Sequence, residues 1–186
     1  MLLPLTGWAV TGFIFFVKPG YGAAYEILQP GTYPIEGNIS IQPDPAWMEF
    51  RYLRTILGGH LLVRTSKGWS HLDTQTLQPV SLPDKEAIRS LLEDAFTANP
   101  GRYGKVVSVE GNQITTDTGI RIKLDWQRLS LDQRGPDTDR IDLLYRIHYL
   151  QWTGVAAIDR VLSLLGITLV IVLSALGARL FFKPGP

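Results

Sequence analysis

The segment KVVSVEGNQITTDTGIRIKLD, residues 105–125, alternates apolar and polar side chains along three short stretches. This alternation predicts two strands over 105–110 and 113–117, joined by a short turn, and a third strand over 120–125. Side chains of alternate residues point to opposite faces of a strand. One face of the resulting antiparallel sheet is therefore expected to be buried and the other to face water.

A helix is expected immediately before this sheet. Pro83-Asp84 provides its start and Asn99-Pro100 its end. Between these signals, apolar residues recur at helical spacing and form one stripe, which is expected to pack on the sheet. The stripe consists of Ile88, Leu91, Leu92, Ala95 and Phe96.

Three further strands are expected before the helix, over 49–56, 60–65 and 69–74. The last two flank Ser66-Lys67-Gly68, which is typical of a hairpin turn. Strands, helix and strands in this order predict an α+β domain with an antiparallel sheet. The domain organisation expected is an N-terminal transmembrane helix 1–17, a Pro/Gly-rich connector 18–46, the α+β domain 47–135, an amphipathic juxtamembrane helix 136–154, a second transmembrane helix 155–182 and a tail 183–186.

The second transmembrane helix contains VLSLLGITLVIVLSALGA, residues 161–178, with no charged side chain. About 20 apolar residues span the hydrocarbon core of a bilayer, and Leu180 to Phe182 lengthen this run because Arg179 can snorkel. A buried helix of a globular core is the alternative. The small residues of the predicted transmembrane helix, including Gly166 and Gly177, allow another helix to approach closely in lipid.

The first transmembrane helix is MLLPLTGWAVTGFIFFV, residues 1–17, which ends at Lys18. Seventeen uncharged residues are at the lower limit for a span. The alternative is a signal peptide, but no basic residue precedes the apolar run. Gly7, Thr11 and Gly12 are small, and the simplest arrangement is an antiparallel hairpin of the two spans.

Several residues are expected at the membrane interface: Lys18, Tyr145, Tyr149, Trp152, Asp159 and Arg160. Tyrosine and tryptophan settle at the level of the lipid headgroups. Lys18 and Asp159 either form an ion pair between the spans or are separately solvated. Positive residues after the second span favour a cytoplasmic tail. The central domain is therefore expected on the extracytoplasmic side of a bacterial inner membrane.

The composition excludes several classes of protein. The chain has 186 residues, a formal charge of +1 and no cysteine. A disulfide scaffold, a thiolate zinc site, an iron–sulfur cluster and a cysteine nucleophile are therefore excluded. The balanced charge gives no reason to expect nucleic acid as a partner. None of the common hydrolase, phosphate-binding or dinucleotide-binding motifs is present, so no catalytic residue is assigned.

Three stretches carry a resemblance to a known family: residues 8–26, the strand–turn element GWSHLDTQTLQPV at 68–80, and IDLLYRIHYLQWTG at 141–154 before an apolar helix. Together they resemble PepSY domain-containing membrane proteins of the PepSY-associated transmembrane family. Residues 84–125 resemble a second, degenerate copy of the strand and helix unit. The resemblance implies a module that binds or restrains a partner, as in protease propeptides, and larger relatives are associated with haem and iron uptake.

The histidines are the remaining candidates for chemistry. His60 and His71 are expected to be half-exposed on paired strands, either on opposite faces or about four residues apart in register, so that they do not share a metal ion. His148 lies in an uncharged stretch near the membrane boundary, where ionisable groups are candidates for function. It is interpreted as an interface residue, as a contact for a partner, or as an axial ligand of haem.

The sequence thus favours a membrane-anchored, non-enzymatic PepSY-like binding or accessory protein without a bound metal or cofactor. Its expected partners are the lipid bilayer and another membrane or extracytoplasmic protein, and a homodimer is an open alternative. Two other functions remain open: a haem-contacting redox or iron-uptake accessory protein that uses His148, and a protease-regulating module.

Overall fold

The structure is a computed structural model that describes residues 2–37 and 41–182. The chain divides into two compact units. The α+β unit is Gly22–Asp137, and the helical unit comprises the residues up to Tyr21 and from Thr138 onward. The tail expected at 183–186 lies outside the described residues.

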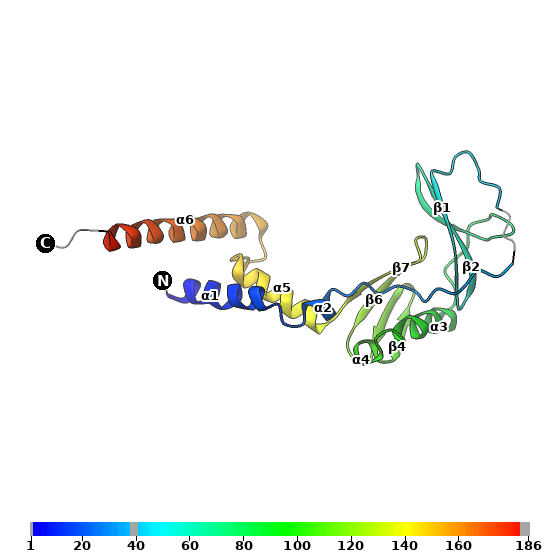
Figure 1. The fold of residues 1–186 in the computed structure, drawn as a ribbon, viewed down its shortest axis with the longest axis horizontal. Helices are drawn as coiled ribbons and strands as arrows, with labels where there is room; N and C mark the ends of the chain where they lie inside the picture. Colours follow the sequence, from blue (N-terminus) through cyan, green and yellow to red (C-terminus); the bar gives the residue numbers. More distant parts are fainter. Residues whose placement is uncertain (1, 38–40, 183–186) are drawn as a thin grey trace. The chain divides into compact units, whose positions relative to one another are not determined.

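The first sheet of the α+β unit contains β1 (Glu49–Thr55), β2 (Gly58–Thr65) and β3 (Gly68–Leu72). The three strands are antiparallel neighbours in chain order (Figure 1). The turn between β2 and β3 has two residues, because Thr65 pairs with Gly68. Gly68 adopts a left-handed φ of 118°, which glycine tolerates without a steric cost.

The second sheet contains β4 (Val106–Glu110), β5 (Gln113–Thr116), β6 (Arg121–Asp125) and β7 (Ser130–Arg134), again antiparallel and in chain order. The first three of these strands follow the sequence prediction. The fourth was not predicted, because SLDQR offers only one apolar side chain. That residue, Leu131, is buried and pairs with Leu124 of β6.

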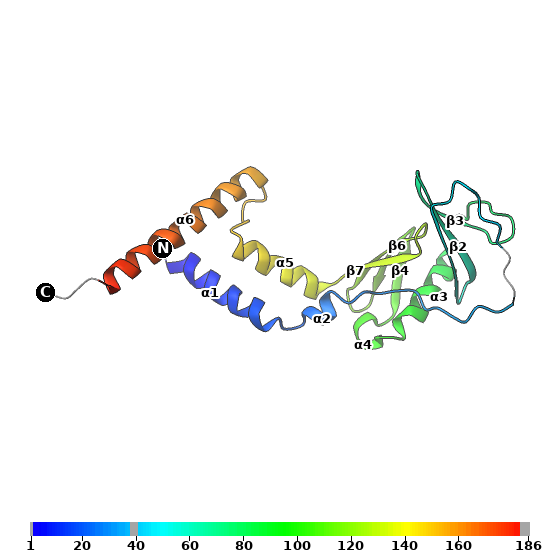
Figure 2. The ribbon, with the colours of Figure 1, turned by 45° about the horizontal axis from the view of Figure 1, so that its top comes forward.

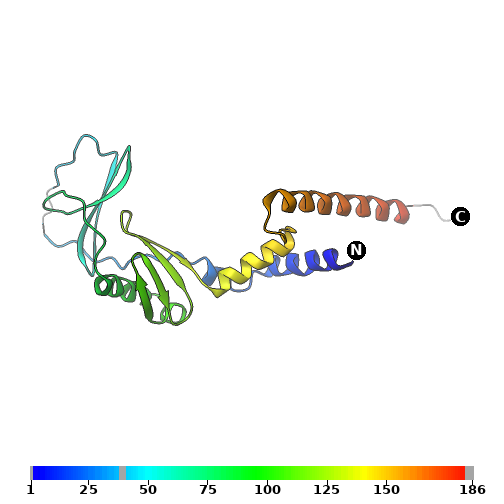
Figure 3. The same cartoon turned by 180° about the vertical axis from the view of Figure 1, so that it is seen from behind.

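One helix packs against the second sheet, as expected from its apolar stripe. Helix α3 (Lys85–Phe96) lies along one face of the sheet, and all five stripe residues are buried (Figures 2 and 3). The Asp84 side chain caps it by accepting from the backbone N–H of Ala87 at 2.8 Å. A short helix, α4 (Pro100–Tyr103), follows and is capped by Asn99.

The hydrophobic core includes residues of α3, α4 and both sheets, with Leu62 of β2 among them. Tyr103 stacks on Phe96 at the end of α3, with ring centroids 5.0 Å apart. The α+β class with antiparallel sheets that the sequence predicts is therefore confirmed.

The connector that precedes the sheets docks onto them. It contains a short helix, α2 (Tyr21–Ala24), and pairs with the outer edge of β1 through a bridge between Tyr33 and Arg54. The Tyr33 hydroxyl donates to Asp94 Oδ1 at 2.5 Å. These contacts hold the extended connector against α3 and β1.

The helical unit contains α1 (Leu2–Val17), α5 (Pro136–His148) from Thr138 onward, and α6 (Ala156–Phe181). Among the described residues, α6 alone is long and apolar enough to cross a membrane, and none of its most apolar window is buried. The apolar part of α1, Leu5–Val17, is shorter than the 18 residues that a candidate span requires. One candidate membrane helix is thus present, at the C-terminal end.

Helix α1 lies beside α5 in the helical unit (Figures 1 and 2). The Phe15 ring stacks on Tyr145 with centroids 4.6 Å apart. A simple hairpin of the two apolar helices was expected instead. Contact between α1 and α6 is made at Gly166, where an added Cβ would lie 2.9 Å from the Trp8 ring. By contrast, nothing lies within 4 Å of the Cβ positions of Gly12 and Gly177.

Candidate functional site

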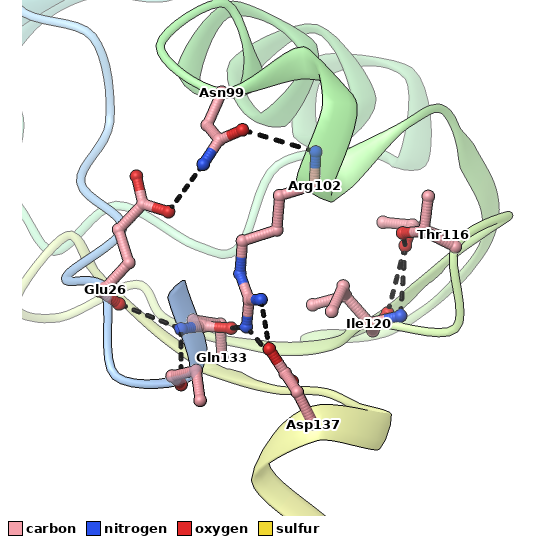
Figure 4. A network of polar contacts seen from close by, with 9 residues as sticks. Glu26, Asn99, Arg102, Thr116, Ile120, Gln133 and Asp137 are labelled. Carbon is pink, nitrogen blue, oxygen red and sulfur yellow. Dashed lines mark hydrogen bonds and ion pairs between the residues drawn. The ribbon is translucent and has the colours of Figure 1, made fainter. Parts of the chain in front are cut away.

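A polar cluster of the α+β unit is centred on Arg102 of α4 (Figure 4). Its side chain is 8% exposed. The guanidinium donates to Asp137 Oδ2 at 2.5 Å and to Gln133 Oε1 at 2.8 Å. Arg102 therefore joins α4 to β7 and to the first residues of α5.

The same cluster reaches the start of the α+β unit. The Gln133 side-chain amide donates to the carbonyls of Ala24 and Glu26, at 3.2 and 2.8 Å. The Asn99 amide donates to Glu26 Oε2 at 2.9 Å. The two ends of the unit, near residues 24–26 and 133–137, are thus bound to each other. Glu26, Asn99, Arg102, Gln133 and Asp137 are called the Arg102 cluster below.

Burial sets the electrostatics of this cluster. Desolvation opposes the charge on Arg102, but the hydrogen bond and the charge of Asp137 outweigh it, so that the pKa of Arg102 is raised. Burial also raises the pKa of the Tyr103 hydroxyl. Arg102 Nε is buried without a hydrogen-bond partner among the described residues. The hydrogen bonds to Asp137 and Gln133 therefore offset the desolvation cost of burying this charge.

The sequence did not reveal this cluster. No motif in the sequence marks Arg102, Gln133 or Asp137. Arg102 follows a helix-breaking Asn-Pro-Gly, and Gln133 lies on the strand that was missed. Their proximity depends on the pairing of β6 with β7, which brings Gln133 opposite Ile122.

The second polar cluster contradicts the expectation for His60 and His71. In the observed register Leu62 faces His71, so His60 is only two residues away on the same face of the sheet. His60 Nδ1 and His71 Nε2 are 3.0 Å apart. Both side chains are buried, with 4% and 1% exposed, rather than half-exposed.

The hydrogen bonds of this pair define a single direction of donation. His71 Nδ1 lies 3.0 Å from the Trp126 carbonyl, which only accepts, so His71 donates there. Its Nε2 then accepts from His60 Nδ1. His60 Nε2 in turn accepts from the Thr55 hydroxyl at 2.7 Å. Each ring nitrogen of the two neutral imidazoles is therefore used inside the fold.

The neutral state of this pair follows from its surroundings. Burial, and secondarily the proximity of His71, lower the pKa of His60 to about 4. Burial also lowers the pKa of His71, against the effect of the Trp126 carbonyl. The Trp126 ring covers the pair, with its centroid 4.3 Å from that of His71. The pair thus connects β2 and β3 to the residues that follow β6.

His148 ends α5 in the helical unit and is half-buried. Its Nδ1 lies 2.8 Å from the Thr11 hydroxyl, and its backbone carbonyl accepts from Trp8 Nε1 at 2.6 Å. Phe15 contacts the ring edge-on. His148 is therefore held in place by three residues of α1.

Next to His148 lies a cavity of about 390 Å³. Its lining consists of Trp8, His148, Tyr149, Leu150, Ser163, Ile167, Val170 and Ile171. This set offers one nitrogen ligand to a haem iron. It contains no Arg or Lys to bind the haem propionates and no second strong ligand. Apart from the one nitrogen that His148 could offer to the iron, the lining therefore does not fit a haem.

The other aromatic and acidic residues expected at the membrane interface belong to the helical unit. Tyr145 and Tyr149 stack with centroids 6.1 Å apart, and Trp152 is 59% exposed. Asp159 is buried and accepts from the Thr153 hydroxyl and backbone N–H, at 2.7 and 2.9 Å.

The ion pair considered between Lys18 and Asp159 is absent from the described part of the chain, in which Lys18 and Arg160 are exposed. The side chain of Asp159 instead closes the loop that leads into α6.

Comparison of this chain with protein-family models, with curated proteins and with solved structures finds no match.

Proposed function

We propose that this protein is a membrane-anchored binding or accessory protein whose α+β unit engages a protein partner outside the cytoplasm. The observation that carries the proposal is α6, a 26-residue helix whose apolar surface is left mostly uncovered by the rest of the described chain. Such a surface is stable in contact with lipid. Helix α1 crosses the membrane with it in this proposal, and α5 lies at the boundary.

The polar clusters of the α+β unit favour binding over catalysis. The Arg102 cluster joins the two ends of the unit, and the histidine pair joins β2 and β3 to Trp126. A catalytic group must reach a substrate with an available atom. The ring nitrogens of His60 and His71 are instead engaged by groups of the fold, as are the terminal nitrogens of the Arg102 guanidinium.

The proposal includes membership of the PepSY-type proteins. A helix packed on antiparallel strands, as in α3 against β4 of the second sheet, is the arrangement that the resemblance implies. The organism is then a bacterium and the membrane its inner membrane. This part of the proposal rests on the sequence resemblance and on the compatible fold class.

The absence of cysteine allows a direct test of anchoring and orientation. Single cysteines are introduced as Lys67→Cys, in the exposed turn between β2 and β3, and as Lys183→Cys beyond α6. We expect a membrane-impermeant maleimide to label the first variant in intact spheroplasts and the second only after the membrane is permeabilised. Labelling of both in intact cells would show that α6 does not cross the membrane as proposed.

The contribution of α1 to membrane anchoring is measured with the same reagents. Deletion of residues 155–186 removes α6, and we expect the remaining chain to stay in the membrane after alkaline carbonate extraction, with Lys67→Cys still labelled from outside. Release of this chain into the soluble fraction would show that α1 does not anchor the protein in the membrane. The full-length chain carried through the same extraction is the control.

A further inference from the structure

The cavity beside His148 has apolar walls and one polar corner. Leu150, Ile167 and Ile171 supply apolar surface, and the Trp8 ring forms part of the side nearest α1. Tyr149, His148 and Ser163 are the polar residues of the lining. The Ser163 hydroxyl is engaged by the backbone carbonyls of Tyr149 and Asp159. A ligand in this cavity must therefore be largely apolar.

The hydrogen bonds of Thr11 determine the tautomer of neutral His148. The Thr11 hydroxyl lies 2.6 Å from the Gly7 carbonyl, one helical turn back, and this oxygen can only accept. The single hydroxyl proton is therefore directed at Gly7, with the Trp8 carbonyl 3.3 Å away as a second acceptor. The lone pair of the hydroxyl then faces His148 Nδ1 at 2.8 Å. Nδ1 must carry a proton.

This tautomer leaves Nε2 of the neutral ring as an acceptor. No protein donor contacts Nε2 within the described residues, whereas Nδ1 is bonded to Thr11. A half-buried acceptor beside an apolar cavity gains a hydrogen bond only from a ligand that donates. An ionised ligand would lose its hydration among these walls without a counter-charge.

We propose that this cavity binds a lipophilic alcohol from the bilayer: a long apolar chain that ends in a hydroxyl. The hydroxyl donates to His148 Nε2, and the chain lies along Ile167 and Ile171 of α6. The inference rests on the proposed function, because a cavity lined by α6 is open to ligands of the bilayer only if α6 lies in the membrane. A lipid tail without a donor is the alternative occupant, and the experiment below separates the two.

The probes are farnesol and farnesyl methyl ether, which share a chain but differ in the ability to donate. Binding to the purified full-length chain in detergent micelles is followed by quenching of tryptophan fluorescence, and Trp8→Phe assigns the signal to this cavity. We expect saturable binding of farnesol and about tenfold weaker binding of the ether, the loss typical of one hydrogen bond. Equal affinities, or no saturable binding of farnesol, would overturn the proposal.

Three variants locate the acceptor. His148→Leu should bind both probes equally, and Thr11→Val should reduce the preference for the alcohol because the tautomer is no longer imposed. Tyr149→Phe removes the other available hydroxyl and should retain the preference. Loss of the preference in Tyr149→Phe, or its retention in His148→Leu, contradicts the assignment. Detergent binding does not depend on how the chain is oriented in a cell, so this test and the cysteine labelling can fail separately.

Discussion

Replacement of Arg102 by methionine is expected to lower the free energy of unfolding of the α+β unit by about 3–5 kcal/mol. Methionine retains much of the apolar stem, but it leaves the Asp137 carboxylate without the guanidinium that now lies 2.5 Å away. It also removes the donor to Gln133 Oε1. Urea unfolding of the full-length chain in detergent, followed by tryptophan fluorescence, measures the change.

Two further variants separate the ion pair from a general effect of losing an arginine. Arg128→Met removes an exposed guanidinium with no ion pair among the described residues, and we expect a change below about 0.5 kcal/mol. Arg102→Met combined with Asp137→Leu should recover part of the stability, because the carboxylate that has lost the Arg102 guanidinium is removed as well. A loss below about 1 kcal/mol for Arg102→Met alone would show that the cluster does not hold the unit together.

The stability of the α+β unit is expected to fall by about 2 kcal/mol between pH 7.5 and pH 5 through His60 alone. The pKa of His60 is about 4 in the folded chain, against 6.5 for an unperturbed histidine. The unfolded state therefore binds a proton first as the pH falls. Stability is complete above about pH 6.5 and decreases until the folded pKa is reached, for a total of roughly 3 kcal/mol. His71, whose pKa is also lowered, adds to the decrease.

Urea unfolding of the full-length chain at a series of pH values measures this dependence. His60→Gln should be less stable at pH 7.5 and should show a smaller decrease towards pH 5, because it cannot titrate. His148→Gln, in the other unit, should keep the wild-type slope for unfolding of the α+β unit. An unchanged slope in His60→Gln would mean that the buried pair is not the source of the acid sensitivity.

Much of the α+β unit could be predicted because its signals are local. The apolar stripe of α3 and the alternation along β6 each appear within a few residues, and both correspond to buried faces in the structure. Strand β7 was missed because it has one apolar side chain and takes its place by pairing with β6. Long-range pairing of this kind leaves little trace in a polar segment.

The polar clusters could not be predicted for a related reason. His60 and His71 meet only in a register set by a two-residue turn, and a shift of one residue would put His71 on the other face. Arg102 meets Gln133 and Asp137, and Gln133 in turn meets Ala24 and Glu26, which are all far apart in sequence. His148 was singled out from sequence because of its apolar surroundings, but its bond to Thr11 follows from the packing of α5 on α1.

The Arg102 cluster has a mechanical consequence. The chain enters and leaves the α+β unit at positions that are bonded to each other through Gln133, Glu26 and Asp137. Tension applied to the chain at one end of the unit therefore passes to the chain at the other end through a few polar bonds. Of the seven strands only β7 takes part, through Gln133, so a pull on the two ends of the unit would strain this junction before it shears either sheet.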